Sequence, residues 1–334
     1  MNMEFKCIDA HTCGNPVRVV TTGHPDLKGA NMSEKRLHFL NHFDWIRTGL
    51  MFEPRGHDMM SGSFIFPPHN IENDCAVLFI ETSGCLPMCG HGTIGTVTVA
   101  IEEGLITPKN AGKLKIETPA GLVEVTYAEK NGKVEWVKLT NVKSYLAQSN
   151  LTIESSVLGK LTFDVSYGGN FYAIIDPQKN FSGIQDFTAA EIIRHSQELR
   201  EKINKKYPKY FIHPEDSNIK DVSHMLWTGT PLKASSSGRN AVFYGDKAID
   251  RSPCGTGTSA RMAQLFSKGF LQLDEDFVHE SYIGSTFTGR IEEISKIGDT
   301  QAIIPSIKGW AKIFGHNTIL IDKEDPYAAG FQVI

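Results

Sequence analysis

The sequence has no run of basic residues and no apolar stretch long enough to cross a membrane. Its longest apolar stretch, around Thr93–Ile101, is far shorter than the roughly 20 residues that a membrane-spanning helix needs. The formal net charge is -4, which disfavours a polyanionic partner. We therefore expect neither nucleic acid nor a membrane as a partner.

Signals for export and for metal binding by paired cysteines are also missing. The first residues, MNMEFKCIDAH, lack the basic flank and apolar core of a signal peptide, so we expect a cytosolic protein. The six cysteines include no Cys-x-x-Cys pair, and no histidine pair at helical ligand spacing accompanies them. We expect reduced thiols and no metal site, a Cys85–Cys89 disulfide being the alternative.

The composition is that of an ordinary globular protein, with 40% hydrophobic and 22% charged residues. At 334 residues the chain is longer than one hydrophobic core comfortably supports. Two domains are therefore expected.

Two short stretches share one pattern: CGHGT from Cys89 and CGTGT from Cys254. Each places glycine one, three and fifteen residues after the cysteine, and threonine four residues after it. Glu117–Gly121 (ETPAG) follows the first stretch, and Glu280–Gly284 (ESYIG) follows the second at nearly the same distance. We interpret this as a duplication in which each half contributes one thiol to a shared site.

Local patterns predict the elements around these stretches. Strands are predicted at Phe5–Ile8, Cys75–Glu81, Leu114–Val142 with a turn at Asn131-Gly132, Phe163–Ile175 with a break at Gly168-Gly169, His224–Thr228, Ala241–Gly245 and Thr318–Asp322. Helices are predicted from Ser33 to Arg47, from Asp186 to about Lys206, and after each motif cysteine as far as Gly104 and Gly269. Loops are predicted at Asp9–Pro16 and Glu53–Gly62.

The last predicted strand is expected to pair back with the first part of the chain. The resulting division places residues 1–143 and 317–334 in one domain, which carries Cys89. Residues 144–316 form the other domain, which carries Cys254.

A helix after each cysteine gives the thiol a chemical role. A helix N-terminus carries unpaired N–H groups and about half a positive charge. We expect this charge to lower the pKa of the cysteine, and the glycine-rich turn to let N–H groups approach a carboxylate. Two such loops facing one another would set a thiol on each side of the carbon next to that carboxylate. This arrangement predicts racemisation or epimerisation by two bases.

Other chemistry fits single features of the pattern. A glycine-rich turn also binds phosphate, but neither copy has the Lys-Ser/Thr ending of a nucleotide loop. A hydrolase could pair Cys89 or Cys254 with His91 or His224, which leaves the second cysteine without a role. A non-catalytic amino-acid-binding protein is a third reading. Spacing does not reveal a Schiff-base lysine for pyridoxal phosphate, and two thiols make that cofactor unnecessary, so no cofactor is expected.

Four longer strings carry a further signal: Asp9–Arg18 (DAHTCGNPVR), Glu53–Gly62 (EPRGHDMMSG), Gly84–Gly95 (GCLPMCGHGTIG) and Asp250–Ala263 (DRSPCGTGTSARMA). With them the chain resembles the proline racemase family nearly end to end, and more closely its 4-hydroxyproline epimerase branch. The resemblance implies an α/β (α+β) fold like that of diaminopimelate epimerase. Two pseudo-symmetric domains would each curl a mostly antiparallel sheet around a central helix, with the active site in the cleft between them.

The resemblance also implies roles for individual residues. Cys89 and Cys254 would be the two catalytic bases, acting without a cofactor, and the protein would form a homodimer. The substrate carboxylate would be held chiefly through backbone N–H groups, and the ring ammonium by a carboxylate. The residues concerned are Gly90, His91, Gly255 and Thr256 for the carboxylate, and Asp250 for the ammonium.

The choice of substrate depends on two positions. Ser61 and His224 stand where proline racemases that resemble this chain carry an aromatic residue and a cysteine. A buried ring hydroxyl needs polar partners, which these two side chains would supply. Relatives that dehydrate 3-hydroxyproline lack at least one of the two cysteines, and both are present here. We therefore expect interconversion of trans-4-hydroxy-L-proline and cis-4-hydroxy-D-proline, with proline racemisation as the alternative.

Overall fold

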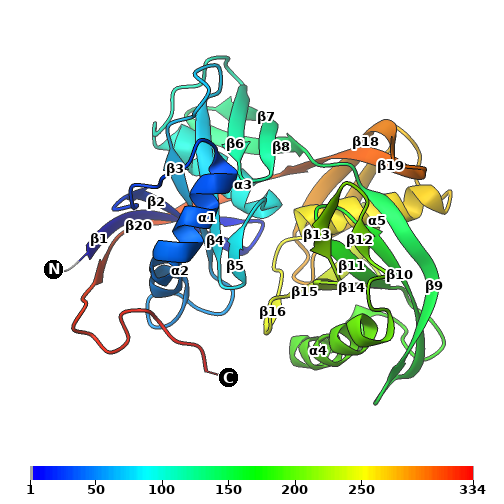
Figure 1. The fold of residues 1–334 in the computed structure, drawn as a ribbon. Helices are drawn as coiled ribbons and strands as arrows, with labels where there is room; N and C mark the ends of the chain where they lie inside the picture. Colours follow the sequence, from blue (N-terminus) through cyan, green and yellow to red (C-terminus); the bar gives the residue numbers. More distant parts are fainter. Residues whose placement is uncertain (1–2, 334) are drawn as a thin grey trace. The chain divides into compact units, whose positions relative to one another are not determined.

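The computed structural model describes residues 3–333, apart from the side chain of residue 218 (Figure 1). The chain divides into two compact units. The first runs from the N-terminus to Leu139 and resumes at Gly309, and the second is Thr140–Lys308. The chain therefore returns to its first unit at the end.

The first unit contains strands from both ends of the chain. Its strands are β1 (Met3–Thr12), β2 (Asn15–Thr22), β3 (Ser61–Phe66), β4 (Cys75–Glu81), β5 (Gly84–Leu86), β6 (Lys113–Thr118), β7 (Gly121–Lys130), β8 (Lys133–Thr140) and β20 (Ala311–Ile321). Its helices are α1 (Met32–His42), α2 (Asp44–Met51) and α3 (Gly90–Glu102). The strands pair in the order β20–β1–β2–β3–β4, with β5 and β6 both on β4 and then β7 and β8. In Figure 1 the red β20 accordingly lies beside the blue β1.

The second unit is built in the same way. Its strands are β9 (Tyr145–Ser155), β10 (Gly159–Tyr167), β11 (Phe171–Ile175), β12 (Ile212–His213), β13 (Asp216–Lys220), β14 (His224–Gly229), β15 (Gly238–Tyr244), β16 (Ala248–Ile249), β17 (Asp276–Glu280), β18 (Thr286–Ile297) and β19 (Thr300–Gly309). Its helices are the 3-10 turn η1 (Ile184–Asp186), α4 (Ala189–Lys206) and α5 (Gly255–Ser267). The strands pair in the order β9–β10–β11–β14–β15, with β16 and β17 both on β15 and then β18 and β19. The strands β12 and β13 form a separate hairpin.

The two pairing orders correspond strand for strand. Each unit has two parallel pairings, β2–β3 and β4–β6 in the first and β11–β14 and β15–β17 in the second. One helix enters at the same place in each unit, α3 between β5 and β6 and α5 between β16 and β17. The expected pair of mostly antiparallel sheets, each with its own helix, is confirmed.

Helix α3 owes its existence to packing more than to its sequence. Its threonine, valine and isoleucine residues are mediocre helix formers, yet Gly90 to Ala100 are all buried. The helix packs against β1, β2, β3 and β20. A Cβ on Gly95 would lie 2.8 Å from Val17 and 2.9 Å from Thr12, so a glycine is needed where the strands approach. Its counterpart α5 packs against β9, β10, β11 and β18.

Corresponding glutamates fasten corresponding loops. The carboxylate of Glu117, on β6, accepts hydrogen bonds of 2.8–2.9 Å from backbone and side-chain N–H groups of the loop 67–74. The carboxylate of Glu280, on β17, accepts hydrogen bonds of 2.6–2.9 Å from two backbone N–H groups and a hydroxyl of the loop 230–237. Each loop leads into the strand that precedes a cysteine motif, so the repeated glutamates share one structural role.

Several local predictions are confirmed and others are wrong. The strand at Cys75–Glu81, the turn at Asn131-Gly132 and the pairing of the last strand with the first are confirmed. The loop predicted at Asp9–Pro16 is wrong, because β1 and β2 continue to a two-residue turn at Cys13-Gly14. Both turn residues have positive φ, 48° and 99°, as tight hairpins require.

The sequence predicts where these helices lie, but it does not predict the residues at which they begin. The helix predicted from Ser33 is capped by Asn31, whose side chain accepts the Glu34 N–H, and a break at Phe43 divides it into α1 and α2. Helix α4 starts after Thr188 instead of Asp186. Thr188 and the glutamate three residues later form a capping box, which supplies both missing hydrogen bonds.

One strand was not predicted, and another is longer than predicted. The loop predicted at Glu53–Gly62 gives way to β3 at Ser61, which places that serine in the sheet. The final strand begins at Ala311, well before Thr318, because it pairs with β1 along its whole length. The sequence-based division after residues 143 and 316 stays a prediction, and the second unit observed here ends at Lys308.

Replacing Glu117 with glutamine tests the anchoring of its loop. Burial alone would raise the pKa of Glu117, but hydrogen bonds from Asn73, His69 and Asn70 lower it from 4.5 to about 2. A depressed folded-state pKa means that this stabilisation is present above pH 4.5 and is lost as the pH falls towards 2. We expect Glu117→Gln to lower the free energy of unfolding at neutral pH by about 1–3 kcal/mol, measured by urea unfolding.

Urea unfolding at acidic pH supplies a control for this experiment. Between pH 4.5 and 2 the difference between wild type and Glu117→Gln should shrink. The matched substitution Glu124→Gln, at an exposed position of β7, should leave the urea midpoint unchanged. Equal midpoints for Glu117→Gln and wild type at neutral pH would contradict the anchoring role.

Candidate active site

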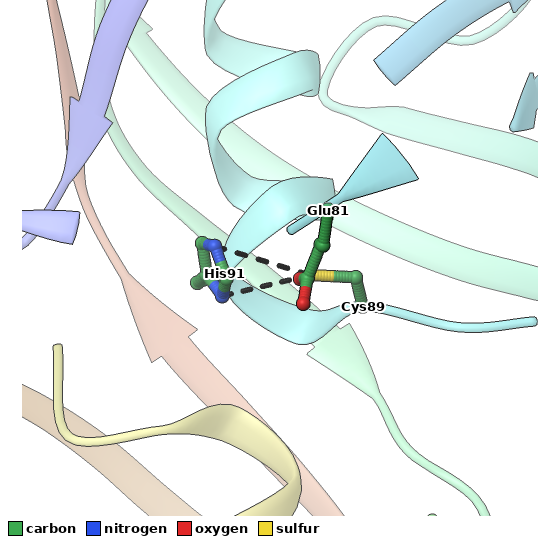
Figure 2. A group of neighbouring side chains, drawn as sticks. All are labelled: Glu81, Cys89 and His91. Carbon is green, nitrogen blue, oxygen red and sulfur yellow. Dashed lines mark hydrogen bonds between the residues drawn. The ribbon is translucent and has the colours of Figure 1, made fainter. Parts of the chain in front are cut away.

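Cys89 is the N-cap of α3, and its Sγ accepts the N–H of Gly92 at 3.3 Å. Two further side chains reach the same sulfur, Glu81 with Oε1 at 3.1 Å and His91 with Nδ1 at 3.5 Å. Figure 2 shows Glu81 and Cys89 side by side, with the His91 ring facing the sulfur. The three residues are 3–6% exposed, so this is a buried cluster of three titratable groups.

The His91 ring is held from its far side. Ser61, at the start of β3, donates its hydroxyl hydrogen to the Pro16 carbonyl at 3.0 Å, and its oxygen lies 2.8 Å from His91 Nε2. The Asn15 side-chain amide nitrogen, which can only donate a hydrogen bond, lies 3.0 Å from the same Nε2. Cys89 Sγ lies 3.5 Å from Nδ1 and 4.0 Å from Nε2, so the ring turns the edge or face between its two nitrogens towards the thiol.

Sequence reasoning missed Glu81. It ends the otherwise apolar strand CAVLFIE, and a charged residue at the buried end of such a strand was the available signal. Burial raises the pKa of Glu81, and hydrogen bonds with Cys89 and Ser83 oppose that rise. The sulfur, imidazole and carboxyl groups together form a set of donor atoms that could hold a metal ion.

Cys254 occupies the same position at the N-terminus of α5. Its Sγ accepts the N–H of Gly257 at 3.3 Å. The neighbours differ from those of Cys89: Tyr172 lies with its hydroxyl at 3.4 Å and Thr256 with Oγ1 at 3.8 Å. Tyr172 is fully buried on β11 and is 2.6 Å from Thr256. Its sequence context, FYAII, is that of an ordinary core strand, so no local signal marked it.

The backbone of Cys254 is strained, whereas that of Cys89 is not. Cys254 has φ 65° and ψ 113°, a region that side-chain-bearing residues rarely adopt and that costs about 1–3 kcal/mol. The preceding carbonyl, of Pro253, accepts hydrogen bonds from Asn240 at 2.9 Å and Thr258 at 3.2 Å. These bonds hold the loop so that the sulfur lies over the helix end.

The glycine three residues after each cysteine leaves space for the sulfur. A Cβ on Gly92 would lie 2.9 Å from Cys89 Sγ, and a Cβ on Gly257 would lie 3.1 Å from Cys254 Sγ. A larger residue would displace either thiol from its helix N-terminus. The repeated glycine in the motif is therefore explained by the thiol itself.

The prediction that the helix end lowers the thiol pKa is wrong for Cys254. Burial raises the pKa of Cys254 to about 12, and the charge of Asp250 raises it further. Hydrogen bonds from Tyr172, Gly257 and Thr256 lower the pKa without offsetting these effects. Asp250 is itself buried, and its Oδ1 accepts both the N–H and the O–H of Ser252 at 2.8 Å.

Ser61 and His224 occupy corresponding positions in the two units. In the parallel pairings, Ala76 on β4 lies opposite Glu117, and Arg239 on β15 lies opposite Glu280. Because the two glutamates correspond, Ala76 corresponds to Arg239, and this sets the register of β4 against β15. On that basis Gly62, opposite Ile80, matches Met225, opposite Phe243. The residue before each of these on its strand is Ser61 in the first unit and His224 in the second.

His224 is a neutral imidazole beside Tyr172, the residue whose hydroxyl contacts the Cys254 sulfur. Burial, with a contribution from Arg200, lowers the pKa of His224 to about 3. Its Nδ1 lies 2.7 Å from the Ser223 hydroxyl, and its ring centroid lies 4.7 Å from that of Tyr172. The remaining ring nitrogen belongs to a group that can either donate or accept a hydrogen bond.

Comparison with known proteins assigns the chain to a family. The sequence pattern of the family described as proline racemase matches residues 7–332. The chain belongs to the proline racemase family. Among the described residues, no helix combines the length and apolar character needed to cross a membrane, and none of the six cysteines forms a disulfide.

Several curated relatives are similar over nearly their whole length. A 4-hydroxyproline 2-epimerase of Spirosoma linguale is 62% identical over 331 residues, 99% of this chain and 98% of the relative. A 4-hydroxyproline 2-epimerase of Shewanella loihica is 59% identical over 330 residues, 99% of this chain and 98% of the relative.

Solved structures show the same fold. A hydroxyproline epimerase from Agrobacterium vitis with bound trans-4-hydroxy-L-proline has a TM-score of 0.86 and 26% identity, covering 99% of this chain and 96% of that one. A Bacillus anthracis phenazine biosynthesis protein of the PhzF family has a TM-score of 0.61 at 16% identity, covering 96% of this chain and 99% of that one. The second likeness concerns the fold alone. The two-domain epimerase fold expected from the sequence is confirmed.

The substitution Asp250→Asn tests the cause of the raised thiol pKa. It removes the charge while leaving an oxygen that can accept the hydrogen bonds of Ser252. The pKa of Cys254 should fall from about 12, so more thiolate forms near neutral pH. Each unit of pKa changes the thiolate fraction about tenfold, and we expect iodoacetamide to alkylate Cys254 severalfold faster.

Mass spectrometry of the Cys254 peptide measures this rate. Cys75, whose thiol is also buried with a pKa of about 12, serves as the internal reference in the other unit and should react at an unchanged rate. An unchanged Cys254 rate in Asp250→Asn would show that burial alone controls the thiol.

Proposed function

We propose that this chain is a 4-hydroxyproline 2-epimerase that interconverts trans-4-hydroxy-L-proline and cis-4-hydroxy-D-proline without a cofactor. The observation that carries the proposal is the repeated placement of a buried thiol at the N-terminus of a central helix. Relatives at 62% and 59% identity bear that name, and a structural neighbour holds trans-4-hydroxy-L-proline.

Inversion at Cα needs two groups of complementary protonation. One thiolate takes the Cα proton, and the electron pair of the broken C–H bond remains on the substrate as a carbanion-like state. The second thiol delivers its own proton to the opposite face of the same carbon. Cys89 and Cys254 would exchange these roles with the direction of reaction. One proton is taken up and one is given, so the count is conserved, and proton exchange of the two cysteines with solvent restores the starting form.

The helix N-termini would stabilise the negative charge. The first helical hydrogen bonds run from Thr93 N–H to Cys89 and from Thr258 N–H to Cys254, and the motif glycines at the third position bond the sulfurs. The preceding backbone N–H groups, in the first turn of each helix, are placed to bind an anion. We assign the substrate carboxylate to them, and they belong to Gly90, His91, Gly255 and Thr256.

Asp250 would bind the ring ammonium and thereby influence Cys254. In the ligand-free chain its charge contributes to the raised pKa of that thiol. An ammonium paired with the carboxylate offsets this charge, which favours the thiolate. Substrate binding would therefore help to generate the base that acts on the substrate.

His91 and Glu81 would serve the other thiol. Glu81 Oε1, 3.1 Å from Cys89 Sγ, accepts the thiol hydrogen and would take it up when Cys89 acts as the base. The His91 ring, with Nδ1 3.5 Å from the sulfur, would stabilise the thiolate. This asymmetry gives the two thiols different partners for the same step.

The corresponding positions Ser61 and His224 would recognise the ring hydroxyl. The Ser61 oxygen, already between His91 and Pro16, has a second lone pair for a hydroxyl donor. The neutral His224 can donate or accept. Leaving a buried hydroxyl without a partner costs about 1–3 kcal/mol, so these residues favour hydroxyproline over proline. Proline racemisation remains the second candidate, since it requires the same thiols.

A cytosolic location and a homodimer complete the proposal. Six cysteines without a disulfide suit a reducing compartment. The homodimer follows only from the family resemblance, and size-exclusion chromatography with light scattering would test it.

Proton NMR in heavy water tests the activity. We expect reduced protein to remove the Cα-proton signal of trans-4-hydroxy-L-proline while signals of the cis-D isomer grow. A parallel sample with L-proline should exchange far more slowly. Exchange mainly with L-proline would change the assignment to proline racemase, and saturable binding without exchange would favour a binding protein.

Serine substitutions test the two-thiol mechanism. Cys89→Ser and Cys254→Ser should each lower the epimerisation rate by at least about 10²–10⁴-fold, the usual contribution of a general acid or base. Cys75→Ala, which alters a buried cysteine of β4 outside the site, should keep near-normal activity. Full activity in either serine variant would exclude the two-base mechanism.

A further inference from the structure

The cluster around Cys89 has the composition of a metal site. Within the described part of the chain, Glu81, Cys89 and His91 bring a carboxylate oxygen, a sulfur and an imidazole nitrogen within 4.8 Å of one another (Figure 2). We propose that these three residues bind a thiophilic divalent cation, Zn²⁺ or Cd²⁺, which blocks Cys89. The binding itself is independent of the proposed epimerase activity, and the inhibition rests on it.

The distances suit such an ion. Zinc lies about 2.3 Å from a thiolate sulfur and about 2.0–2.1 Å from an imidazole nitrogen or carboxylate oxygen. Tetrahedral angles then separate the sulfur from either other ligand by about 3.5 Å. Cys89 Sγ lies 3.5 Å from His91 Nδ1 and 3.1 Å from Glu81 Oε1. Because the sulfur also lies 4.0 Å from His91 Nε2, the ring must rotate to aim Nδ1 at the ion. That rotation would complete a three-ligand site with the fourth position left for water.

Polar side chains contact the far nitrogen of the imidazole ligand. Ser61 Oγ lies 2.8 Å and Asn15 Nδ2 lies 3.0 Å from His91 Nε2. Ligating histidines generally donate their other ring N–H to such a partner. A cation bound through Nδ1 would place the ring hydrogen on Nε2, where the Ser61 oxygen can accept it.

Charge also favours a divalent ion. A thiolate and a carboxylate in one buried cluster carry two negative charges, which a divalent cation neutralises. Protons compete with a metal ion for sulfur, carboxylate and imidazole ligands, so binding should weaken as the pH falls. An ion bound to Sγ occupies the lone pair that would otherwise accept the Cα proton.

The second unit provides an internal comparison. The register that aligns β4 with β15 puts Tyr244 at the position of Glu81, and Thr256 stands at the position of His91. Cys254 therefore has no counterpart of the carboxylate or imidazole ligand at these positions. Selective binding at Cys89 follows from the divergence of the two halves.

The sequence-based expectation of no metal site used ligand pairs close together in the chain. Here Cys89 and His91 come from the start of α3, and Glu81 comes from the end of β4. Their approach depends on how the strand and helix pack, which local spacing does not reveal.

Cadmium titration tests the site through the ultraviolet charge-transfer absorption of the cadmium–thiolate bond. The full chain is stripped with a chelator and kept reduced with a phosphine. We expect saturation at one Cd²⁺ per chain, loss of the signal in Cys89→Ser and its retention in Cys254→Ser. Glu81→Gln, which preserves shape, should weaken binding about tenfold or more. Zn²⁺ should displace the signal and inhibit turnover.

Three results would overturn the proposal. They are a signal that persists in Cys89→Ser, a signal lost in Cys254→Ser, which would indicate an ion shared by both thiols, or unchanged affinity in Glu81→Gln. Circular dichroism of each variant verifies folding, and protection of Cys89 from alkylation by Zn²⁺ in wild type gives a second readout that needs no variant. The expected cadmium pattern in a chain without epimerase activity would support the site and count against the proposed function.

Discussion

The hydrogen bond from a helix N-terminus to a cysteine sulfur is the interaction on which the site depends. It occurs twice, from Gly92 to Cys89 and from Gly257 to Cys254, at 3.3 Å in both cases. It requires a helix that starts at the cysteine and a glycine that leaves space for the sulfur. The helix in turn requires strands around it, because α3 is too rich in β-branched residues to be stable alone.

The two halves share a framework and differ in the groups that control their thiols. The repeated pairing order and the matching roles of Glu117 and Glu280 preserve the framework. Around the sulfurs the duplication has diverged: Cys89 has Glu81 and His91, whereas Cys254 has Tyr172 and a strained backbone. A duplicated scaffold thus holds two thiols in chemically different surroundings.

The same divergence links catalysis and inhibition. In the proposed mechanism the carboxylate and imidazole beside Cys89 would assist proton transfer, and the same two groups are good ligands for a thiophilic ion. Around Cys254 the groups are a phenol and a hydroxyl, which are poor zinc ligands, and its thiol depends on the charge state of Asp250. The groups that surround each thiol would therefore determine both its proposed step and what else can bind there.

The sequence by itself determined the duplication, both cysteine-capped helices, about half of the strands and the family, because these depend on local spacing and on long specific strings such as Asp250–Ala263. Tertiary structure alone decided which groups meet each sulfur. Tyr172 looks like a core residue in sequence, the charge of Glu81 at the end of an apolar strand does not reveal its partner, and the direction of the Cys254 pKa shift depends on burial. Desolvation and contacts between distant elements are properties of packing, which local sequence patterns do not encode.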